Sequence, residues 1–311
     1  MNRQIIIIAG PTAVGKTEYA IETAKAIDGE IVSADSMQLY KYMDIGSAKP
    51  SKSELAQVKH YLVDQIDPRD KFSVAKYQRL AKAAIEEIFA KGKTPVISGG
   101  TGLYINSLMY EMDFAAGPAD DLLRKQLEQL ASEKGREYLH MELARLDPEA
   151  AVRIHPNNTQ KIIRAIEAAR NGSKVKSFDN ASVPTADYDV LLAGLTRDRA
   201  ELYDRINTRV DMLVSQGLAD EVASLMQMGL GYDDISMKGI GYKEIIGFYE
   251  GRYSLDEAIE LIKKNTRHYA KRQLTWLRRY DNIKWFNLSD YDDKAMAMGD
   301  ILRWLNTNKN R

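Results

Sequence analysis

The chain has 311 residues, 44% apolar and 28% charged, which is the composition of a globular protein with a sizeable core and about two domains. Lys plus Arg and Asp plus Glu each total 44, so net charge alone indicates no class of partner. The lack of cysteine excludes disulfides, thiol catalysis and thiolate zinc sites, and the 4 histidines are too scattered to suggest a metal cluster.

The longest apolar run, residues 5–9, is far shorter than the roughly 20 residues that cross a bilayer. The first residues also lack the succession of charged, apolar and small residues that marks a signal peptide. We therefore expect a cytoplasmic protein with no membrane partner, and we expect a monomer.

The first part of the chain alternates between strand and helix patterns. Apolar strands are predicted at 4–9, 30–34 and 95–98, and helices at 16–27 and 73–90, where apolar residues recur at helical spacing. Strands that alternate with helices indicate a parallel sheet covered on both faces. We predict an α/β fold with a P-loop NTPase-like parallel sheet flanked by helices.

The strand pattern disappears between residues 113 and 186. Helices are predicted there at 121–134, 138–146, 148–154 and 159–171, which indicates an all-α insertion domain. A further apolar strand at 189–195 and helices at 200–228 and 254–279 follow. We therefore divide the chain into 1–112, the first part of the core; 113–186, the helical insertion; and 187–311, the second part of the core with basic C-terminal helices.

The segment GPTAVGKT fits the pattern G-x-x-x-x-G-K-[ST] directly after the first strand and before a helix. Such a loop binds phosphate or diphosphate through its backbone N–H groups, a lysine and a hydroxyl that binds Mg²⁺. No apolar strand ending in Asp supplies a Walker B motif, since the strand 95–98 ends in Ser98, so hydrolysis of ATP is not indicated. The predicted diphosphate-binding residues are Gly10, Pro11, Thr12, Ala13, Val14, Gly15, Lys16 and Thr17, with Thr17 as the Mg²⁺ ligand.

Asp35 ends the second predicted strand, at the sheet edge where open α/β folds bind ligands. Its carboxylate is suited to bind Mg²⁺ or to accept a proton from an attacking amine or hydroxyl. The competing interpretation is an aspartate that caps a local turn. The segment GGTGLY after the third strand adds Thr101 as a donor near the same edge, although glycines after a strand are also common in plain turns.

Two basic patterns complete the candidates. Arg205 and Arg209 lie four positions apart on a predicted helix, suited either to phosphate or to pairing with the nearby acids Glu201, Asp204 and Asp211. Residues 263–279 contain no acidic residue. A basic helix that only faces solvent normally has acidic residues among its basic ones, so we favour contacts with a nucleic-acid backbone. The positions at helical spacing are Lys264, His268, Lys271, Thr275 and Arg278.

These segments resemble the tRNA dimethylallyltransferase (isopentenyltransferase) family in order and over nearly the whole chain. The P-loop is generic, but its combination with SADSMQLYKYMDIGSAKP, GGTGLY, RIHPNNTQKIIRAIE, LYDRINTRVDMLVSQGL, GIGYKE and KRQLTWLRR is specific. The resemblance implies transfer of a dimethylallyl group from dimethylallyl diphosphate to the exocyclic amine of the adenosine 3′-adjacent to the anticodon, in tRNAs that read codons beginning with U.

The resemblance also implies roles for individual residues. Asp35 would be the general base, Thr12 and Thr17 would contact the donor or its Mg²⁺, and Thr101 and Arg209 would approach the leaving diphosphate. Asp35 and Thr101 would also contact the tRNA, and the segment from Ser36 through Met37 to Gln38 would hold a flipped adenine. The remaining implied tRNA contacts are Arg124, Gln160, Lys161, Ile162, Ile163, Arg164, Lys238, Gly241, Tyr242, Lys243, Lys271, Arg272, Gln273, Trp276 and Arg278.

Three alternatives remain at this point. A small-molecule P-loop kinase would share the core, but the acid-free basic helix and the missing Walker B strand oppose it. An adenylate isopentenyltransferase would use the same donor but has little need for an extended basic surface. A non-catalytic RNA-binding protein would not need Asp35 beside an intact P-loop.

Overall fold

The computed structural model describes residues 3–112, 120–174 and 183–308. The chain separates into two compact units, one made of Met1–Met109 with Thr185–Arg311 and the other of Tyr110–Pro184. The unit boundaries lie within three residues of the positions 112/113 and 186/187 named from the sequence. Within the described ranges, no helix has the length and apolar character needed to cross a membrane.

The first unit is built on a sheet of six parallel strands in the order β3-β2-β4-β1-β5-β6. The central strand, β1, is buried along its whole length because it has a paired neighbour on both sides and side chains packed on both faces. The strands are β1 (Gln4–Ala9), β2 (Gly29–Ala34), β3 (His60–Tyr61), β4 (Thr94–Gly99), β5 (Asp189–Thr196) and β6 (Ile283–Asn287).

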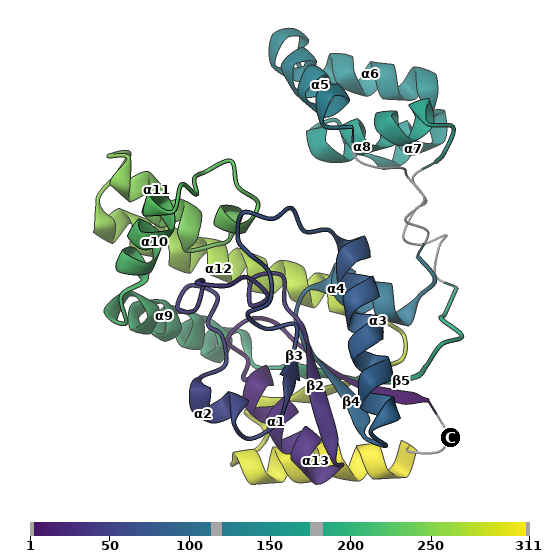
Figure 1. The fold of residues 1–311 in the computed structure, drawn as a ribbon, viewed down its shortest axis with the longest axis vertical. Helices are drawn as coiled ribbons and strands as arrows, with labels where there is room; N and C mark the ends of the chain where they lie inside the picture. Colours follow the sequence, from purple (N-terminus) through teal and green to yellow (C-terminus); the bar gives the residue numbers. More distant parts are fainter. Residues whose placement is uncertain (1–2, 113–119, 175–182, 309–311) are drawn as a thin grey trace. The chain divides into compact units, whose positions relative to one another are not determined.

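Helices pack on this sheet and extend from it (Figure 1). Ile6 and Ile8 of β1 share a core with residues of α1 and α13, while Ile5 and Ile7 point to the opposite face by the alternation of a strand. The helices of this unit are α1 (Lys16–Ala26), α2 (Lys52–Leu55), α3 (Val74–Ala90), α4 (Gly102–Met109), α9 (Arg199–Ser215), α10 (Leu218–Gln227), α11 (Tyr242–Tyr249), α12 (Leu255–Leu277) and α13 (Lys294–Asn308), with 3-10 turns at Ser236–Lys238 and Leu288–Asp290.

The second unit is a cluster of four helices around its own apolar core. Helix α8 supplies much of that core through a strongly one-sided distribution of apolar residues, with Ile162 and Ile166 fully buried. The helices are α5 (Asp121–Lys134), α6 (Arg136–Leu146), α7 (Pro148–Arg153) and α8 (Thr159–Arg170). Residues 113–119 and 175–182 of the predicted insertion lie outside the described residues.

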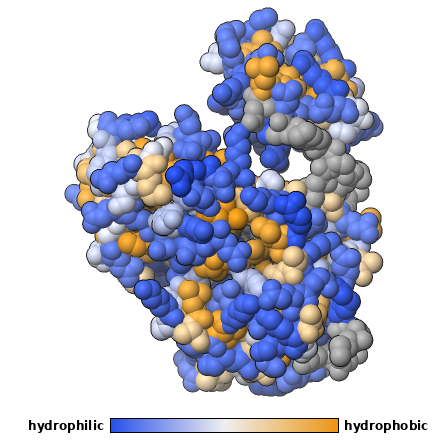
Figure 2. Space-filling view, in the orientation of Figure 1, coloured by the Kyte–Doolittle hydropathy of each residue, from blue (hydrophilic) through white to orange (hydrophobic). Residues whose placement is uncertain are grey.

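The predicted elements are confirmed except in the C-terminal part. The single helix expected over 200–228 is wrong, since the chain breaks at Gly217, whose φ of 99° is left-handed and ends α9 before α10 begins. Strand β6 and helix α13 were not predicted, and neither was the two-residue β3. Figure 2 shows mainly hydrophilic residues on the visible face, with apolar residues in scattered groups.

Candidate active site

The predicted P-loop follows β1 and curls tightly before α1. Ala13 and Gly15 have positive φ values of 63° and 111°, so the backbone turns back on itself at these positions. Two arginines hold the loop from outside: the Arg205 Nε donates to the Ala13 carbonyl at 3.0 Å and the Arg197 Nε donates to the Val14 carbonyl at 3.1 Å. Arg205 is therefore a support of the loop rather than one arm of a fork on phosphate.

A cavity of about 210 Å³ opens beside this loop and collects residues from distant parts of the sequence. The P-loop contributes one wall, the ends of β2 and β4 a second, and α9 and α12 a third. The predicted site residues that line it are Thr12, Ala13, Gly15, Lys16, Thr17, Asp35, Gln38, Arg209 and Gln273. The sequence thus located a site whose parts the parallel sheet brings together at the carboxyl ends of its strands.

Two cations, Lys16 and Arg209, line this cavity. Burial lowers the pKa of Lys16 to about 8, with Arg209 lowering it further and Asp35 opposing the change. Burial lowers the pKa of Arg209 as well, again opposed by Asp35. Glu18 and Glu54 line the cavity together with Asp35, so three carboxylates accompany the two cations there. Lys16 and Arg209 are desolvated, and an anion bound beside the P-loop would stabilise the charged form of each.

Asp35 both caps a turn and faces the cavity. Its Oδ1 accepts hydrogen bonds from the backbone N–H of Met37 at 2.8 Å and of Gln38 at 3.4 Å. The turn-capping interpretation is confirmed, and the cavity gives the same carboxylate access to a ligand, so its role toward a ligand stays a prediction. A fixed carboxylate is suited to act as a general base because little reorganisation is needed during proton transfer.

Thr101 ties two of the site loops together. Its Oγ1 accepts a hydrogen bond from the Ser36 N–H at 3.1 Å, and its own N–H donates to the Ala34 carbonyl at 3.2 Å. Thr101 thus orients the turn that carries Asp35 through the contact of its hydroxyl oxygen with the Ser36 N–H. The predicted contact of Thr101 with a diphosphate stays a prediction.

Gln273 lies on α12 and is only 6% exposed. Its Oε1 accepts from the Thr12 N–H at 2.9 Å and its Nε2 donates to the Gly100 carbonyl at 2.9 Å. Gly100 must be glycine here because a Cβ at that position would lie 2.2 Å from this amide. The implied tRNA contact of Gln273 is therefore corrected: its side chain joins the P-loop to the loop after β4.

The outer side of α12 carries the basic residues that the sequence singled out. Lys264, Lys271, Arg272 and Arg278 are exposed. None of these four forms an ion pair with any residue in the described ranges, whereas Lys263 pairs with Asp211 at 2.8 Å and with Glu260 at 3.1 Å. Trp276 is partly exposed beside Gly102. Unpaired cations on one side of a helix are available for phosphates.

Comparison with known proteins assigns this chain to a family. The family model described as IPP transferase matches residues 38–280, which is more than half of the chain. The chain belongs to the IPP transferase family.

Relatives of this IPP transferase agree over nearly their full lengths. A tRNA dimethylallyltransferase of Alkaliphilus oremlandii is 53% identical over 94% of this chain and 94% of its own, and one of Clostridioides difficile is 48% identical over 97% of each. The solved structure of a tRNA isopentenylpyrophosphate transferase from Bacillus halodurans matches with a TM-score of 0.75 and 40% identity, over 98% of this chain and 96% of that one.

A further similarity is to a eukaryotic protein. The structure of a eukaryotic dimethylallyltransferase acting on tRNA matches with a TM-score of 0.82 and 25% identity, covering 100% of this chain and 81% of that chain. The fold of this IPP transferase is thus the P-loop NTPase-like α/β fold that the sequence indicated.

Of the residues implied to contact tRNA in the helical unit, some have exposed side chains and others are buried. Gln160, Lys161 and Arg164 are exposed on α8, whereas Ile162 and Ile163 are 0% and 3% exposed in the core. The implied contacts of these two isoleucine side chains are therefore corrected to packing. Arg124 is bound by Glu167, with the Arg124 Nη2 2.7 Å from a carboxylate oxygen.

The implied tRNA contacts in the segment 238–243 also include both exposed and buried residues. Lys238 is exposed, and the half-buried Lys243 has its Nζ 3.6 Å from the Glu244 carboxylate. Tyr242 is fully buried and its hydroxyl donates to Glu221 at 2.9 Å, so its side chain does not face a ligand. Gly241, with a φ of 100°, starts α11.

Sequence reasoning missed several residues of the site region, among them Glu18, Ser47 and Glu54, which line the cavity. Tyr269 lines the cavity, and burial with the nearby Asp35 raises its pKa to about 12. Its spacing of four positions from Gln273 places both on one face of α12, a signal that the search for basic residues overlooked. Nothing in the sequence pointed to Glu221, because three of its four hydrogen-bond donors are backbone N–H groups far away in the sequence.

Proposed function

We propose that this IPP transferase moves a dimethylallyl group from dimethylallyl diphosphate to the exocyclic amine of the adenosine 3′-adjacent to the anticodon, in tRNAs that read codons beginning with U, with release of diphosphate. The observation that carries the proposal is the placement of Asp35 in one cavity with Lys16 and Arg209. A base for the amine and two cations for the leaving group are thereby within one site.

The donor half of the reaction uses the P-loop as a diphosphate anchor. Lys16 and Arg209 would neutralise the diphosphate while the allylic carbon–oxygen bond breaks, and Thr12 and Thr17 would orient it. We propose Mg²⁺ as the cofactor: when bound, it neutralises further negative charge on the diphosphate. Thr17 supplies an oxygen ligand that Mg²⁺ prefers, and since no group of three His, Cys, Asp or Glu side chains in the described part of the chain forms a metal site, the donor's own oxygens and water would complete the shell.

The acceptor half uses the turn at Asp35. The amine nitrogen forms a bond with the allylic carbon, its proton passes to the Asp35 carboxylate, and the electron pair of the broken bond leaves with the diphosphate. The adenine reaches the cavity only after it leaves its stack, which costs a few kcal/mol and less in an anticodon loop than in a duplex. Ser36, Met37 and Gln38 would hold the flipped base.

The proposed contacts with tRNA are polar and basic side chains, most of them exposed. On α12 the proposed phosphate contacts are Lys271, Arg272 and Arg278, and on α8 they are Gln160, Lys161 and Arg164. Lys238 and Lys243 would add to them. A monomeric, cytoplasmic enzyme with no membrane partner remains part of the proposal.

A single assay separates this proposal from its alternatives. Labelled dimethylallyl diphosphate is incubated with the protein, Mg²⁺ and one acceptor at a time: tRNA, AMP or ATP. Label should pass to tRNA alone. Transfer to AMP or ATP would indicate an adenylate isopentenyltransferase. Absence of transfer, with phosphate moved from ATP to a small molecule instead, would indicate a kinase and contradict the proposal.

A further inference from the structure

The loop between β2 and α2 forms the wall of the cavity that faces the proposed adenine. Asp35, Gln38 and Ser47 line the cavity from this loop. The loop follows an irregular path with left-handed residues at Tyr42 and Ala48, where φ is 64° and 47°. Such a path needs support from outside the loop, because these residues do not favour that conformation by themselves.

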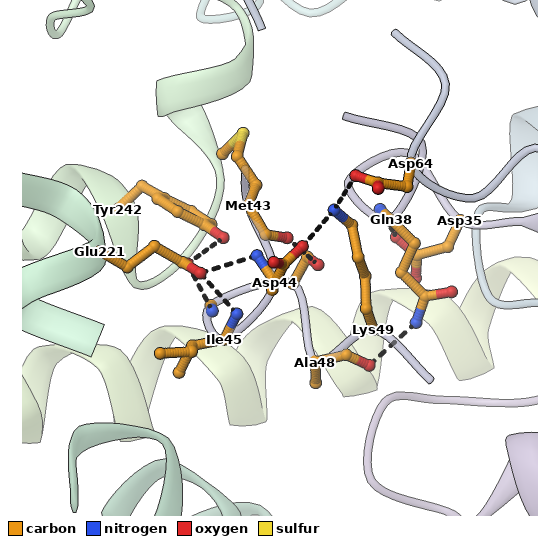
Figure 3. Close-up of polar contacts among 12 residues, drawn as sticks. Asp35, Gln38, Met43, Asp44, Ile45, Ala48, Lys49, Asp64, Glu221 and Tyr242 are labelled. Atoms are coloured by element: carbon orange, nitrogen blue, oxygen red, sulfur yellow. Dashed lines mark hydrogen bonds and ion pairs between the residues drawn. The ribbon is translucent and has the colours of Figure 1, made fainter. Parts of the chain in front are cut away.

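Glu221 on α10 supplies this support (Figure 3). Its Oε2 accepts hydrogen bonds from the N–H of Asp44 and of Ile45, each at 2.7 Å. Its Oε1 accepts from the Gly46 N–H at 2.9 Å and from the Tyr242 hydroxyl at 2.9 Å. Four donors thus converge on one carboxylate, which holds three successive backbone groups of the loop.

The support continues from these backbone groups to the cavity. The Ala48 N–H donates to the Ile45 carbonyl at 2.8 Å, and the Ala48 carbonyl accepts from the Gln38 Nε2 at 3.1 Å. The Gln38 Oε1 in turn accepts from the Ser33 hydroxyl at 3.3 Å, and the Gln38 N–H donates to Asp35 at 3.4 Å. The amide of Gln38 is therefore oriented by a chain of contacts that begins at Glu221.

The surroundings leave the loop little freedom to move at this point. A Cβ on Gly46 would lie 2.6 Å from the Tyr242 ring, so the loop packs directly on that ring. Lys49 is largely buried and its Nζ contacts Asp44 and Asp64 together. Glu221 and Tyr242 themselves do not line the cavity.

We infer that Glu221 is a positioning residue that sets the orientation of Gln38 and thereby the fit of the acceptor base. The inference rests on the proposed function, because the contact between Gln38 and the acceptor adenine is part of that proposal. A glutamine at 221 cannot replace the carboxylate: it has one acceptor oxygen, and its NH₂ group would face backbone donors. The P-loop has no part in these contacts, so binding of the donor should not depend on Glu221.

The test compares Glu221→Gln with Asp220→Asn, a matched control that removes one carboxylate from the exposed neighbouring position of the same helix. We expect Glu221→Gln to lower the single-turnover rate of prenyl transfer to tRNA about 10- to 100-fold. Its dissociation constant for dimethylallyl diphosphate should stay within about twofold of the wild type. Hydrogen exchange at the amides of residues 44–46 should accelerate in Glu221→Gln and not in Asp220→Asn.

A double-mutant cycle with Gln38→Ala then shows whether Glu221 acts through Gln38. We expect the double variant to transfer no more slowly than Gln38→Ala alone, since the orientation of a missing side chain has no effect. Additive losses, a wild-type rate in Glu221→Gln, or an equal loss of donor affinity would overturn the inference. Failure of the wild type to prenylate tRNA would instead overturn the proposed function, so the two failures are distinguishable.

Discussion

Thr12 and Gln273 lie 261 positions apart in the sequence and are joined by a 2.9 Å hydrogen bond from the Thr12 N–H to the Gln273 Oε1. The same amide reaches the Gly100 carbonyl through its nitrogen. Helix α12 therefore supports the P-loop with a buried side chain while its exposed positions carry Lys271 and Arg272. One helix therefore supports the P-loop through a buried side chain and also presents exposed cations.

Replacing Gln273 tests this support. Gln273→Leu leaves the Thr12 N–H and the Gly100 carbonyl without their partner, which costs about 1–3 kcal/mol for each buried group. We expect weaker binding of dimethylallyl diphosphate and a lower melting temperature, with tRNA affinity nearly unchanged. Thr275→Ala, on the exposed part of the same helix, is the control. A selective loss of tRNA affinity in Gln273→Leu would return this residue to the tRNA-binding surface.

Asp35 is expected to act as the general base. Asp35→Asn keeps the oxygen that caps the turn at Met37 but removes the proton acceptor. The single-turnover rate should fall about 10²- to 10⁴-fold, the usual contribution of a positioned base, with tRNA affinity nearly unchanged. Rapid quench measurements with saturating tRNA provide the rate. A wild-type rate in this variant would show that another group accepts the proton.

The lowered pKa of Lys16 predicts how donor binding depends on pH. Lys16 is protonated below about 8, and its positive charge attracts the diphosphate. The association constant for dimethylallyl diphosphate should therefore fall as pH rises above 8, because the neutral amine attracts the anion less. Titration calorimetry from pH 7 to 9.5 measures the change. Lys16→Met should bind weakly and with little dependence on pH, and a similar slope in both proteins would assign the titration to another group.

The lowered pKa of Lys16 also predicts how the free energy of unfolding depends on pH, and this dependence is opposite to that of donor binding. The pKa of Lys16 is 10.5 ordinarily and about 8 in the folded chain, so between these values the unfolded chain binds more protons. The contribution of Lys16 to the free energy of unfolding should therefore rise with pH across this interval. Denaturant melts of wild type and Lys16→Met at pH 7 and 10 measure it; no difference between the two proteins in their response to pH would contradict the assignment.

Exposed cations of α12 should contribute to the salt dependence of tRNA binding. Log affinity falls as log salt concentration rises, and each phosphate contact with a largely single-stranded loop makes this slope more negative by about 0.7. Lys271→Ala should make that slope shallower by about 0.7, while Lys263→Ala should leave it unchanged, since Lys263 is already paired with acids. Fluorescence titration of labelled tRNA at several salt concentrations measures both. Equal slopes in wild type and Lys271→Ala would remove this helix from the RNA-binding surface.

Much of the site was predictable because its chemistry is local in the sequence. The P-loop residues and Asp35 follow apolar strands, and parallel strands bring such loops to one edge of the sheet. The helical insertion was equally clear, since α8 has strong helical periodicity. The family resemblance then implied tRNA contacts for whole segments of the chain, so the buried Ile162 and Ile163 were included with their exposed neighbours.

What the sequence did not show depends on long-range packing. Strand β6 has only 5 residues and includes Lys284, so its pattern was too short and too polar to predict a strand. Gly217 ends α9 by adopting a left-handed conformation that a helical periodicity does not reveal. Glu221 and Gln273 hydrogen-bond to backbone groups. Every residue type except proline has the same backbone N–H and C=O groups, so the sequence does not reveal such contacts.

The most direct test of the account is to locate the product. Purified tRNA that reads a codon beginning with U is incubated with the protein, dimethylallyl diphosphate and Mg²⁺, then digested and analysed by mass spectrometry, while released diphosphate is measured in parallel. The account predicts one dimethylallyl group on the adenosine 3′-adjacent to the anticodon for each diphosphate released, and none with Asp35→Asn on the same timescale. A prenyl group elsewhere in the tRNA, or diphosphate released without a modified adenosine, would contradict it.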